Sequence, residues 1–271
     1  MKKYKYIVTS GWWCDNDTSD DREKKLGDTQ LRQVDFFSKW HEAIVKFSNP
    51  EKVLIIDSAS PVKPDLSSFS NVHFLSIDYN PGHSSKHLNR YSGVTYAHVL
   101  GMAYALLEDV DYWVYVEQDA LIYGEGIIEH AISKMNKGIM FGSGLGTPQP
   151  MQQSLMIFHK DSIGRFLKDL SRISYPDREF SPEMKFAVAA SPILRIFPNF
   201  FIRVILTKGL LGKVFKKAFF LLSNSSLSGY QALPFGYGRA RPIKFDDKYY
   251  YFQHGSVEEL RSHNVRRSDD R

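Results

Sequence analysis

Two acidic side chains stand one residue apart at the end of an apolar run, and this spacing points to chemistry with a metal ion or a nucleotide. The run is 112–116 (YWVYV), which alternates aromatic and β-branched residues as a buried central strand does. Glu117 and Asp119 follow at once, where the strand should end. Carboxylate oxygens suit hard divalent cations such as Mg²⁺ or Mn²⁺. The alternative is a solvated acidic turn, since acid-x-acid triplets also occur by chance.

The C-terminal third supplies further groups of the right type. His254 follows 249–252 (YYYF), for which we expect a strand, and a neutral imidazole can complete a carboxylate site on a metal. Arg239 and Arg241 lie on the glycine-bearing stretch 236–242 (GYGRARP). Their guanidinium groups suit phosphate or sugar-acid oxygens. A structural or exposed histidine and solvated arginines are the alternatives.

Strands alternate with helices in the elements that must position these residues. We predict strands at 5–9, 53–56, 72–77, 138–141 and 153–158, and helices at 31–47, 92–108 and 127–135. Asp28 is the expected N-cap of the first helix. This alternation, up to about residue 160, predicts an α/β fold in which a parallel sheet is covered on both faces.

Several polar residues occur where the predicted strands end. In open α/β sheets, ligands gather at the carboxyl ends of the strands, so we expect these residues to contact a nucleotide. Taken singly, each is more typical of a turn or cap. The candidates are Thr9, Ser10 and Gly11 after the first strand, Asp57 after the second, and Asn80 with Arg90 after the third.

Length and composition are those of one folded domain. The chain has 271 residues, 43% of them hydrophobic and 24% charged, and a net charge of +5. The single cysteine, Cys14, cannot form an internal disulfide, which fits a reducing compartment. The N-terminus lacks the apolar run of a signal peptide, and no stretch is apolar enough to span a membrane. These features predict a cytoplasmic protein.

One basic, apolar segment departs from this composition. Residues 184–245 contain ten Lys or Arg and no Asp or Glu, and 193–222 interleaves six of these cations with Phe, Leu, Ile and Val. This pattern favours helices that lie in an anionic membrane interface, at the inner face of the membrane. A core helix with snorkelling cations is the alternative. The high aliphatic content argues against nucleic acid as a partner.

The order of these features resembles nucleotide-sugar-dependent GT-A glycosyltransferases of the bacterial or viral polysaccharide-building kind. The shared order is a Gly/Ser turn after the first strand, Asp57, the triplet 117–119 in the position of the DxD motif, the glycine-rich loop 142–146 before QQSLMIFH, an acidic helix start and a late histidine. The resemblance covers roughly residues 1–190 and 235–260. The triplet of this chain opens with Glu where the motif has Asp.

The resemblance implies a GT-A, Rossmann-like fold with a mostly parallel sheet flanked by helices and a basic apolar helical insertion. It implies a hexosyl- or pentosyltransferase that uses a nucleotide-diphosphate sugar as donor. In such an enzyme Glu117, Asp119 and His254 would hold Mn²⁺ or Mg²⁺, and Gln118 would lie at the donor. The acceptor would be a glycan or a lipid-linked glycan.

An inverting enzyme of this kind also needs a carboxylate that deprotonates the acceptor hydroxyl. Glu183 and Glu179 stand at the corresponding place in chain order, between the glycine-rich loop and the late histidine. We favour Glu183, because Ser181 and Pro182 indicate a helix start directly before it. Glu183 would otherwise only stabilise the helix dipole, and a retaining enzyme would not need this base.

We expect one domain, 1–271, with two functional halves. Residues 1–125 would bind the nucleotide sugar, and 126–260 would bind the acceptor and include the basic insertion 184–235, ahead of a charged tail at 261–271. Two other functions stay open. A nucleotidyltransferase acting on sugar phosphates would normally carry a basic, glycine-rich loop after its first strand, and this chain does not. A non-catalytic, membrane-associated glycan-binding protein is the second.

Overall fold

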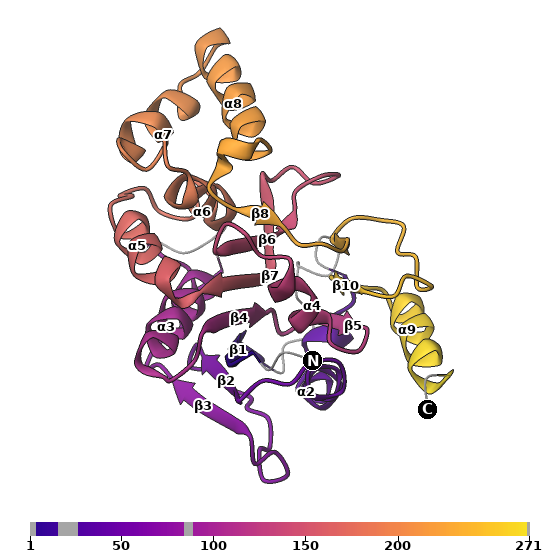
Figure 1. Ribbon diagram of the computed structural model, residues 1–271. Helices are drawn as coiled ribbons and strands as arrows, with labels where there is room; N and C mark the ends of the chain where they lie inside the picture. Colours follow the sequence, from indigo (N-terminus) through magenta and orange to yellow (C-terminus); the bar gives the residue numbers. More distant parts are fainter. Residues whose placement is uncertain (1–3, 16–26, 84–88, 270–271) are drawn as a thin grey trace.

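A seven-stranded sheet forms the centre of the protein, and all of its described strands but one run in the same direction. The computed structural model describes residues 4–15, 27–83 and 89–269 (Figure 1). In spatial order the strands are β3 (Val72–Ser76), β2 (Lys52–Asp57), β1 (Tyr6–Trp12), β4 (Tyr112–Val116), β7 (Met151–His159), β6 (Ile139–Ser143) and β8 (Gln231–Ala232). Only β7 is antiparallel to its neighbours. The predicted α/β fold with a mostly parallel sheet is confirmed.

Two apolar layers cover the faces of this sheet. Tyr6 and Val8 of β1 enter one layer and Ile7 enters the other, because successive side chains of a strand point to opposite faces. The first layer includes α2 (Phe36–Phe47) and α4 (Ile127–Ser133), and the second includes α3 (Gly93–Leu107), α5 (Lys160–Ser171) and α6 (Pro182–Ala190). The central strands of the sheet are thus buried on both sides, while the edge strand β3 is partly exposed.

A second, three-stranded sheet brings the C-terminal part of the chain to the acidic turn. Its strands are β5 (Ala120–Tyr123), β10 (Tyr250–Gln253) and β9 (Tyr237–Gly238). β5 and β10 are antiparallel, and Gln253 lies opposite Ala120. The strand expected at 249–252 is present one residue later, whereas β5 was not predicted. This pairing sets residues 253 and 254 beside residues 117–119.

The first predicted helix begins later than expected. Asp28 precedes a short 3-10 helix, η1 (Thr29–Arg32), without capping it, and α2 starts only at Phe36. The Asp28 carboxylate instead accepts a hydrogen bond from the backbone of Val257, at the start of α9 (Val257–Asp269), at 2.6 Å. The N-cap assignment of Asp28 to a long helix is therefore wrong, because a long-range partner takes its side chain. The residues expected to form the charged tail belong, up to Asp269, to α9.

Within the basic, apolar segment, residues 198–228 form two helices, α7 (Pro198–Leu206) and α8 (Leu210–Ser223), followed by the 3-10 turn η2 (Ser226–Ser228). Figure 1 shows α7 and α8 at one end of the molecule, beyond α6. Ile202, Ile205 and Phe219 are buried in the second apolar layer, so the inner side of the two helices belongs to the core. In the part of the chain that the structure describes, no helix combines the length and apolarity needed to cross a bilayer.

A fully buried ion pair fixes α6 against α3. Lys185 Nζ lies 2.5 Å from Asp177 Oδ1, and neither side chain is exposed. Asp177 Oδ2 accepts three hydrogen bonds of 2.7 Å, from the backbone and hydroxyl of Ser92 and from the hydroxyl of Thr95. Lys185 also donates to the carbonyl of Arg90 at 3.0 Å. Both charges are thus satisfied, as buried charges must be if the fold is to hold them.

Candidate active site

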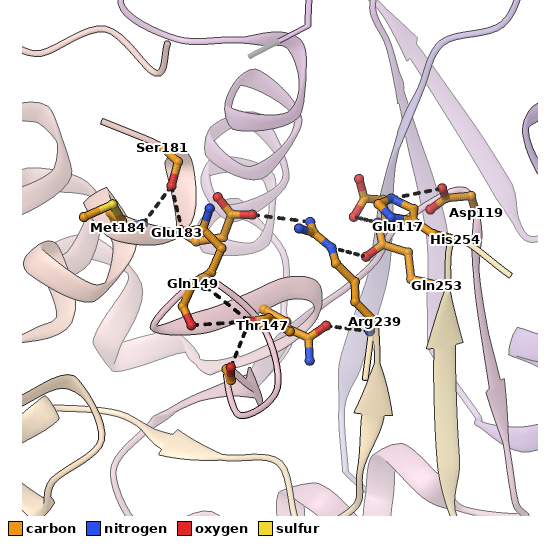
Figure 2. A network of polar contacts seen from close by, with 12 residues as sticks. Glu117, Asp119, Thr147, Gln149, Ser181, Glu183, Met184, Arg239, Gln253 and His254 are labelled. Carbon is orange, nitrogen blue, oxygen red and sulfur yellow. Dashed lines mark hydrogen bonds and ion pairs between the residues drawn. The ribbon is translucent and has the colours of Figure 1, made fainter. Parts of the chain in front are cut away.

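The acidic triplet forms a tight turn between β4 and β5. The backbone N–H of Ala120 donates to the carbonyl of Glu117 at 2.9 Å, which closes the turn. Gln118 fastens it to the end of β1: its side-chain oxygen accepts from Trp13 N at 2.8 Å and its amide nitrogen donates to Trp13 O at 3.0 Å. Gln118 therefore holds the loop that follows β1, and Glu117 and Asp119 are left to face the second sheet (Figure 2).

Glu117 lies among polar neighbours that only partly stabilise its charge. Gln253 Nε2 donates to its Oε2 at 2.6 Å. Burial, and next the charge of Asp119, raise the pKa of Glu117 to about 8, although Arg239 acts in the opposite direction. Without a bound cation, these surroundings therefore favour the protonated form of the carboxyl group.

Asp119 and His254 face each other across the β5–β10 pairing. His254 Nε2 lies 3.5 Å from Asp119 Oδ2, while Asp119 Oδ1 is buried and has no hydrogen-bond partner among the described residues. Burial lowers the pKa of His254 to about 4, against the opposing effect of the Asp119 charge. The imidazole is thus neutral at pH 7, so one ring nitrogen has a free lone pair.

An arginine connects the predicted base to this acidic group. Arg239 Nη2 lies 3.3 Å from Glu183 Oε1, and its Nε donates to Gln253 Oε1 at 3.3 Å (Figure 2). Its backbone N–H donates to Gln152 Oε1 at 2.6 Å, which fixes the loop that carries it. The side chain of Glu183 is only 6% exposed, and that of Arg239 is 28% exposed. Polar contacts therefore run from Glu183 through Arg239 and Gln253 to Glu117.

Glu183 owes its position to the start of α6. The hydroxyl of Ser181 accepts a hydrogen bond from Met184 N at 3.4 Å, with Pro182 in the first helical position, so the predicted helix start is confirmed. The same hydroxyl donates to Gln149 Oε1 at 3.2 Å. The loop between β6 and β7 therefore packs beside the carboxylate.

Two of the predicted site residues near this network have other surroundings. Arg241 is bound to Glu259 of α9, with Nη2 3.1 Å from Oε2, and it also donates to the carbonyl of Gln253 at 2.9 Å. Glu179 is exposed, and its backbone N–H donates to the carbonyl of Pro176. Of the two proposed bases, Glu183 is the one in contact with Arg239.

The residues that end β1 and β2 are held within the protein. Thr9 Oγ1 accepts from the indole of Trp113 at 2.9 Å, and Gly11 N donates to the hydroxyl of Tyr115 at 3.4 Å. A Cβ on Gly11 would lie 2.9 Å from the Cβ of Ala97, so only glycine leaves this turn undisturbed. The hydroxyl of Ser10 is buried and donates to the carbonyl of Gly11.

Asp57, at the end of β2, is buried and has three partners. It accepts from Ser60 N at 3.0 Å and from Ser76 Oγ at 2.5 Å, and Lys63 Nζ lies 3.3 Å from it. This carboxylate joins the ends of β2 and β3 to the loop after β2. None of these contacts reaches the acidic turn.

Asn80 and Arg90 also lie apart from the network around Glu117. Asn80 is exposed, and its side chain accepts from Gly82 N at 2.8 Å in a local turn. Arg90 donates through Nε to the carbonyl of Ile173 at 2.6 Å, and through Nη2 to that of Ser171. The guanidinium group is thus occupied by backbone oxygens at the end of α5.

The fit of a metal ion rests on Asp119 and His254. In residues 4–15, 27–83 and 89–269, no three His, Cys, Asp or Glu side chains are grouped as a ready-made metal site. Asp119 Oδ1 is nevertheless a buried oxygen without a partner in the described parts of the chain, and the neutral His254 lies beside it. Glu117 points one oxygen at Gln253 instead. A divalent cation would supply the missing partner of Asp119, so these two residues fit the group and Glu117 would need to turn toward it.

Gln253 is the residue of this network that sequence reasoning missed. It is fully buried, and its amide joins Glu117 to Arg239 by donating to one and accepting from the other. A glutamine at the end of an aromatic strand, directly before His254, was the available signal. A buried amide needs partners, so its presence in YYYFQHG indicated polar groups on the facing element.

Neither a protein-family model nor a curated protein matches the sequence. Solved structures with a related fold include the galactosyltransferase LgtC in complex with donor and acceptor sugar analogues, with 13% identity, a TM-score of 0.36 and coverage of 62% of each chain. The mannosyltransferase PcManGT from Pyrobaculum calidifontis, in complex with GDP-Man and Mn²⁺, has 12% identity and a TM-score of 0.42 over 68% of this chain and 51% of that one. HddC from Yersinia pseudotuberculosis has 11% identity and a TM-score of 0.43 over 97% and 100%. The first two are matched over less than two thirds of their own length, and all three TM-scores lie below 0.5.

Proposed function

We propose that the protein is a GT-A glycosyltransferase that moves a hexose or pentose from a nucleotide-diphosphate donor to a glycan acceptor. The observation that carries the proposal is the convergence of four side chains from separate elements. Asp119 follows β4, His254 follows β10, Glu183 begins α6, and Arg239 bridges toward them from the loop after β9. Convergent polar groups are typical of catalytic sites, and so are perturbed pKa values such as those of His254 and the neighbouring Glu117.

The donor diphosphate would lie at the acidic turn. Asp119 and His254 would hold Mn²⁺ or Mg²⁺ there, and Glu117 would join them after giving up its contact with Gln253. The bound metal would neutralise charge on the departing nucleotide diphosphate. Gln118 would act indirectly, because both ends of its amide fix the loop after β1. Ser10, Gly11, Asp57 and Asn80 remain the candidates for ribose and base at the carboxyl ends of the strands.

Glu183 would be the base of an inverting transfer. A buried carboxylate at a helix start has the proton-accepting group and the fixed position that the role needs. Its contact with Arg239 at 3.3 Å fixes the position of the carboxylate in the absence of substrate. Arg239 is also the cation placed to bind a phosphate oxygen, which would release Glu183 for the acceptor. Glu179 would be the alternative base, and Arg90 and Arg241 would be further candidates for binding the donor.

The acceptor half would comprise 126–260, with the donor half at 1–125. We propose a glycan or lipid-linked glycan acceptor, with the protein bound peripherally at the inner face of the membrane and no nucleic acid involved. The segment that supports membrane contact is α7 and α8, and its surface is described in the next subsection.

A donor screen tests the proposal directly. Ligands that bind the native state raise its stability, so UDP-, GDP- and dTDP-sugars should be compared by thermal shift with Mn²⁺, with Mg²⁺ and with chelator. We expect one nucleotide class to raise the melting temperature only with metal, and slow metal-dependent release of nucleoside diphosphate. Release of pyrophosphate from a nucleoside triphosphate and a sugar phosphate would indicate a nucleotidyltransferase. No turnover of any donor, with glycan binding retained, would indicate a non-catalytic protein.

A further inference from the structure

The segment 193–227, which contains α7 and α8, exposes an unusual amount of apolar surface. Ten of the sixteen large hydrophobic side chains that are exposed in the described chain lie within 193–227. They are Ile193, Ile196, Phe197, Phe200, Leu206, Leu210, Leu211, Val214, Leu221 and Leu227. Apolar residues scattered singly over a surface are ordinary, but a concentration of this kind marks a contact site.

In α8 the apolar side chains turned away from the protein share one face. Leu210, Val214 and Leu221 are 79%, 55% and 66% exposed. They are separated by four and seven residues, which is close to one and two helical turns, so they project together. Phe219 and Gly212 are buried on the opposite face. The helix therefore has an apolar inner face and a second apolar face directed at the surroundings.

The cations near this outer face have no carboxylate partners among the residues that the structure describes. Four cations of the basic segment are neutralised by acids outside it: Lys185 by Asp177, Arg195 by Asp169, Arg239 by Glu183 and Arg241 by Glu259. Five others lie on α7, α8 and the turn between them, are exposed, and form no ion pair within the described ranges. These are Arg203, Lys208, Lys213, Lys216 and Lys217.

The connection between the two helices leaves no space for a side chain. A Cβ on Gly212 would lie 1.8 Å from the carbonyl oxygen of Thr207, so the first turn of α8 packs directly on the end of α7. On the inner side, Ile202 and Phe219 anchor the pair in the core. The outer face is thus presented by a packed helical hairpin and not by a loose tail.

We propose that this outer face of α7 and α8 binds the surface of an anionic lipid bilayer. Exposed Leu, Val and Phe side chains would enter the boundary between headgroups and acyl chains, and the five unpaired cations would lie at the level of the anionic headgroups. A second copy of the chain is a poor occupant, because an isologous contact would set like cations against each other. An apolar partner without negative charge would leave the five cations unmatched.

This surface also bears on the acceptor, and that part of the inference rests on the proposed function. α6 begins at the predicted base Glu183, and the chain continues from α6 through Ile193 and Phe197 into α7. Binding of α7 and α8 to a membrane would therefore hold α6 near the headgroups. An acceptor sugar carried on a lipid would then reach the site from the membrane surface.

Vesicle sedimentation is the test, using phosphatidylcholine vesicles with and without phosphatidylglycerol at low and high salt. We expect the wild-type protein to sediment with anionic vesicles at low salt, and less at high salt because screening weakens the headgroup attraction. K213E/K216E/K217E should weaken partitioning about 100-fold or more. L210S/V214S/L221S should remove the part of the binding that resists salt. K39E/K134E/K244E, with the same change in charge on other faces, should bind almost as the wild type does.

Three outcomes would overturn the proposal. In the first, the wild-type protein stays in the supernatant with all vesicles. In the second, the hairpin and control triple variants lose vesicle binding equally. In the third, the protein binds no vesicles but self-associates, and L210S/V214S/L221S abolishes this self-association. Melting temperatures of all variants establish that they fold. Calorimetry with nucleoside diphosphate and Mn²⁺ on the same variants separates the two proposals. Vesicle binding without nucleotide binding would remove the glycosyltransferase proposal alone, and the reverse would remove the membrane surface alone.

Discussion

Two buried carboxylate groups of this protein, those of Asp177 and Asp119, differ in how far their neighbours compensate the charge. Asp177 faces a lysine and accepts three further hydrogen bonds, so all of its charge is compensated. Asp119 is almost as buried, yet one of its oxygens has no partner within the described chain and the other faces a neutral histidine at 3.5 Å. Glu117 nearby has one short hydrogen bond and a raised pKa.

The contrast separates a carboxylate whose charge is compensated within the fold from one that still lacks a partner among the described residues. Burying a charge is unfavourable unless it is paired and hydrogen-bonded, and Asp177 meets that condition within the protein. Asp119 does not, so the fold tolerates an unfavourable arrangement that a bound cation would relieve. Substitution of Asp177 should therefore change the free energy of unfolding, whereas substitution of Asp119 should change ligand affinity.

The largest effect should follow Glu183→Gln, which keeps the shape of the side chain but removes its basicity. We expect sugar transfer to fall by about 10²–10⁴-fold with donor affinity retained. Single-turnover kinetics together with donor calorimetry would measure both quantities. Near-normal transfer would show that the base lies elsewhere or that the reaction is retaining.

Asp177→Ala should lower the free energy of unfolding and have no direct effect on sugar transfer. It leaves Lys185 buried without its counter-charge, and breaking such a pair costs about 3–5 kcal/mol. Urea denaturation followed by circular dichroism would measure the loss in the free energy of unfolding. The double variant Asp177→Ala with Lys185→Met should recover part of it, since it removes both charges. A loss below about 1 kcal/mol in the single variant would contradict a structural role.

Asp119→Ala should show the reverse pattern. Its carboxylate has few partners to lose, so we expect the free energy of unfolding to change by less than about 1 kcal/mol. Affinity for nucleoside diphosphate with Mn²⁺ should fall by about 10–100-fold or more. Calorimetric titration with metal, and with chelator as the control, would measure it. Unchanged affinity would remove Asp119 from the metal site.

The smallest effect is a change in how stability depends on pH. Unfolded Glu117 loses its proton near pH 4.5 but keeps it to about pH 8 in the folded protein, so the folded state holds the extra proton and the free energy of unfolding falls as pH rises through that window. His254 acts oppositely between its folded pKa of about 4 and its usual 6.5, where the unfolded state holds the extra proton. Between pH 6.5 and 8 only the Glu117 contribution remains.

Glu117→Gln should therefore remove a downward slope between pH 6.5 and 8 of, at most, about 1.4 kcal/mol per pH unit. Urea denaturation of wild type and variant in chelator, at half-unit pH steps, would measure the difference. Parallel curves for the two proteins over this range would mean that Glu117 is ionised in the folded state at neutral pH.

Local patterns predicted the elements of the fold well and their partners poorly. The strand at 112–116 and the Ser181 helix start are both present, because alternation and capping act over a few residues. The sequence pattern does not predict β5, because its four residues form a strand only by pairing with β10. The prediction that Asp28 caps a helix is wrong because nothing nearby in the sequence reveals its hydrogen bond to Val257, 229 residues away.

The candidate site shows the same division. Glu117, Asp119, Glu183, Arg239 and His254 were chosen by residue type and position, and the structure brings them together in one network or beside it. The contact of Arg239 with Glu183, and the role of Gln253 between Arg239 and Glu117, depend on how β9 and β10 join the second sheet. Sequence spacing does not specify that geometry.

The pairing of β5 with β10 has a consequence for synthesis of the protein. Glu117 and Gln253 are 136 residues apart, so at about 5–20 residues per second the ribosome needs roughly 7–27 s after Glu117 to deliver its partner. During that interval β5 is an unpaired strand edge bearing Leu121 and Ile122, which are fully covered only in the finished fold. Such an edge is open to intermolecular pairing, so we expect the nascent chain to depend on chaperones until β10 has emerged.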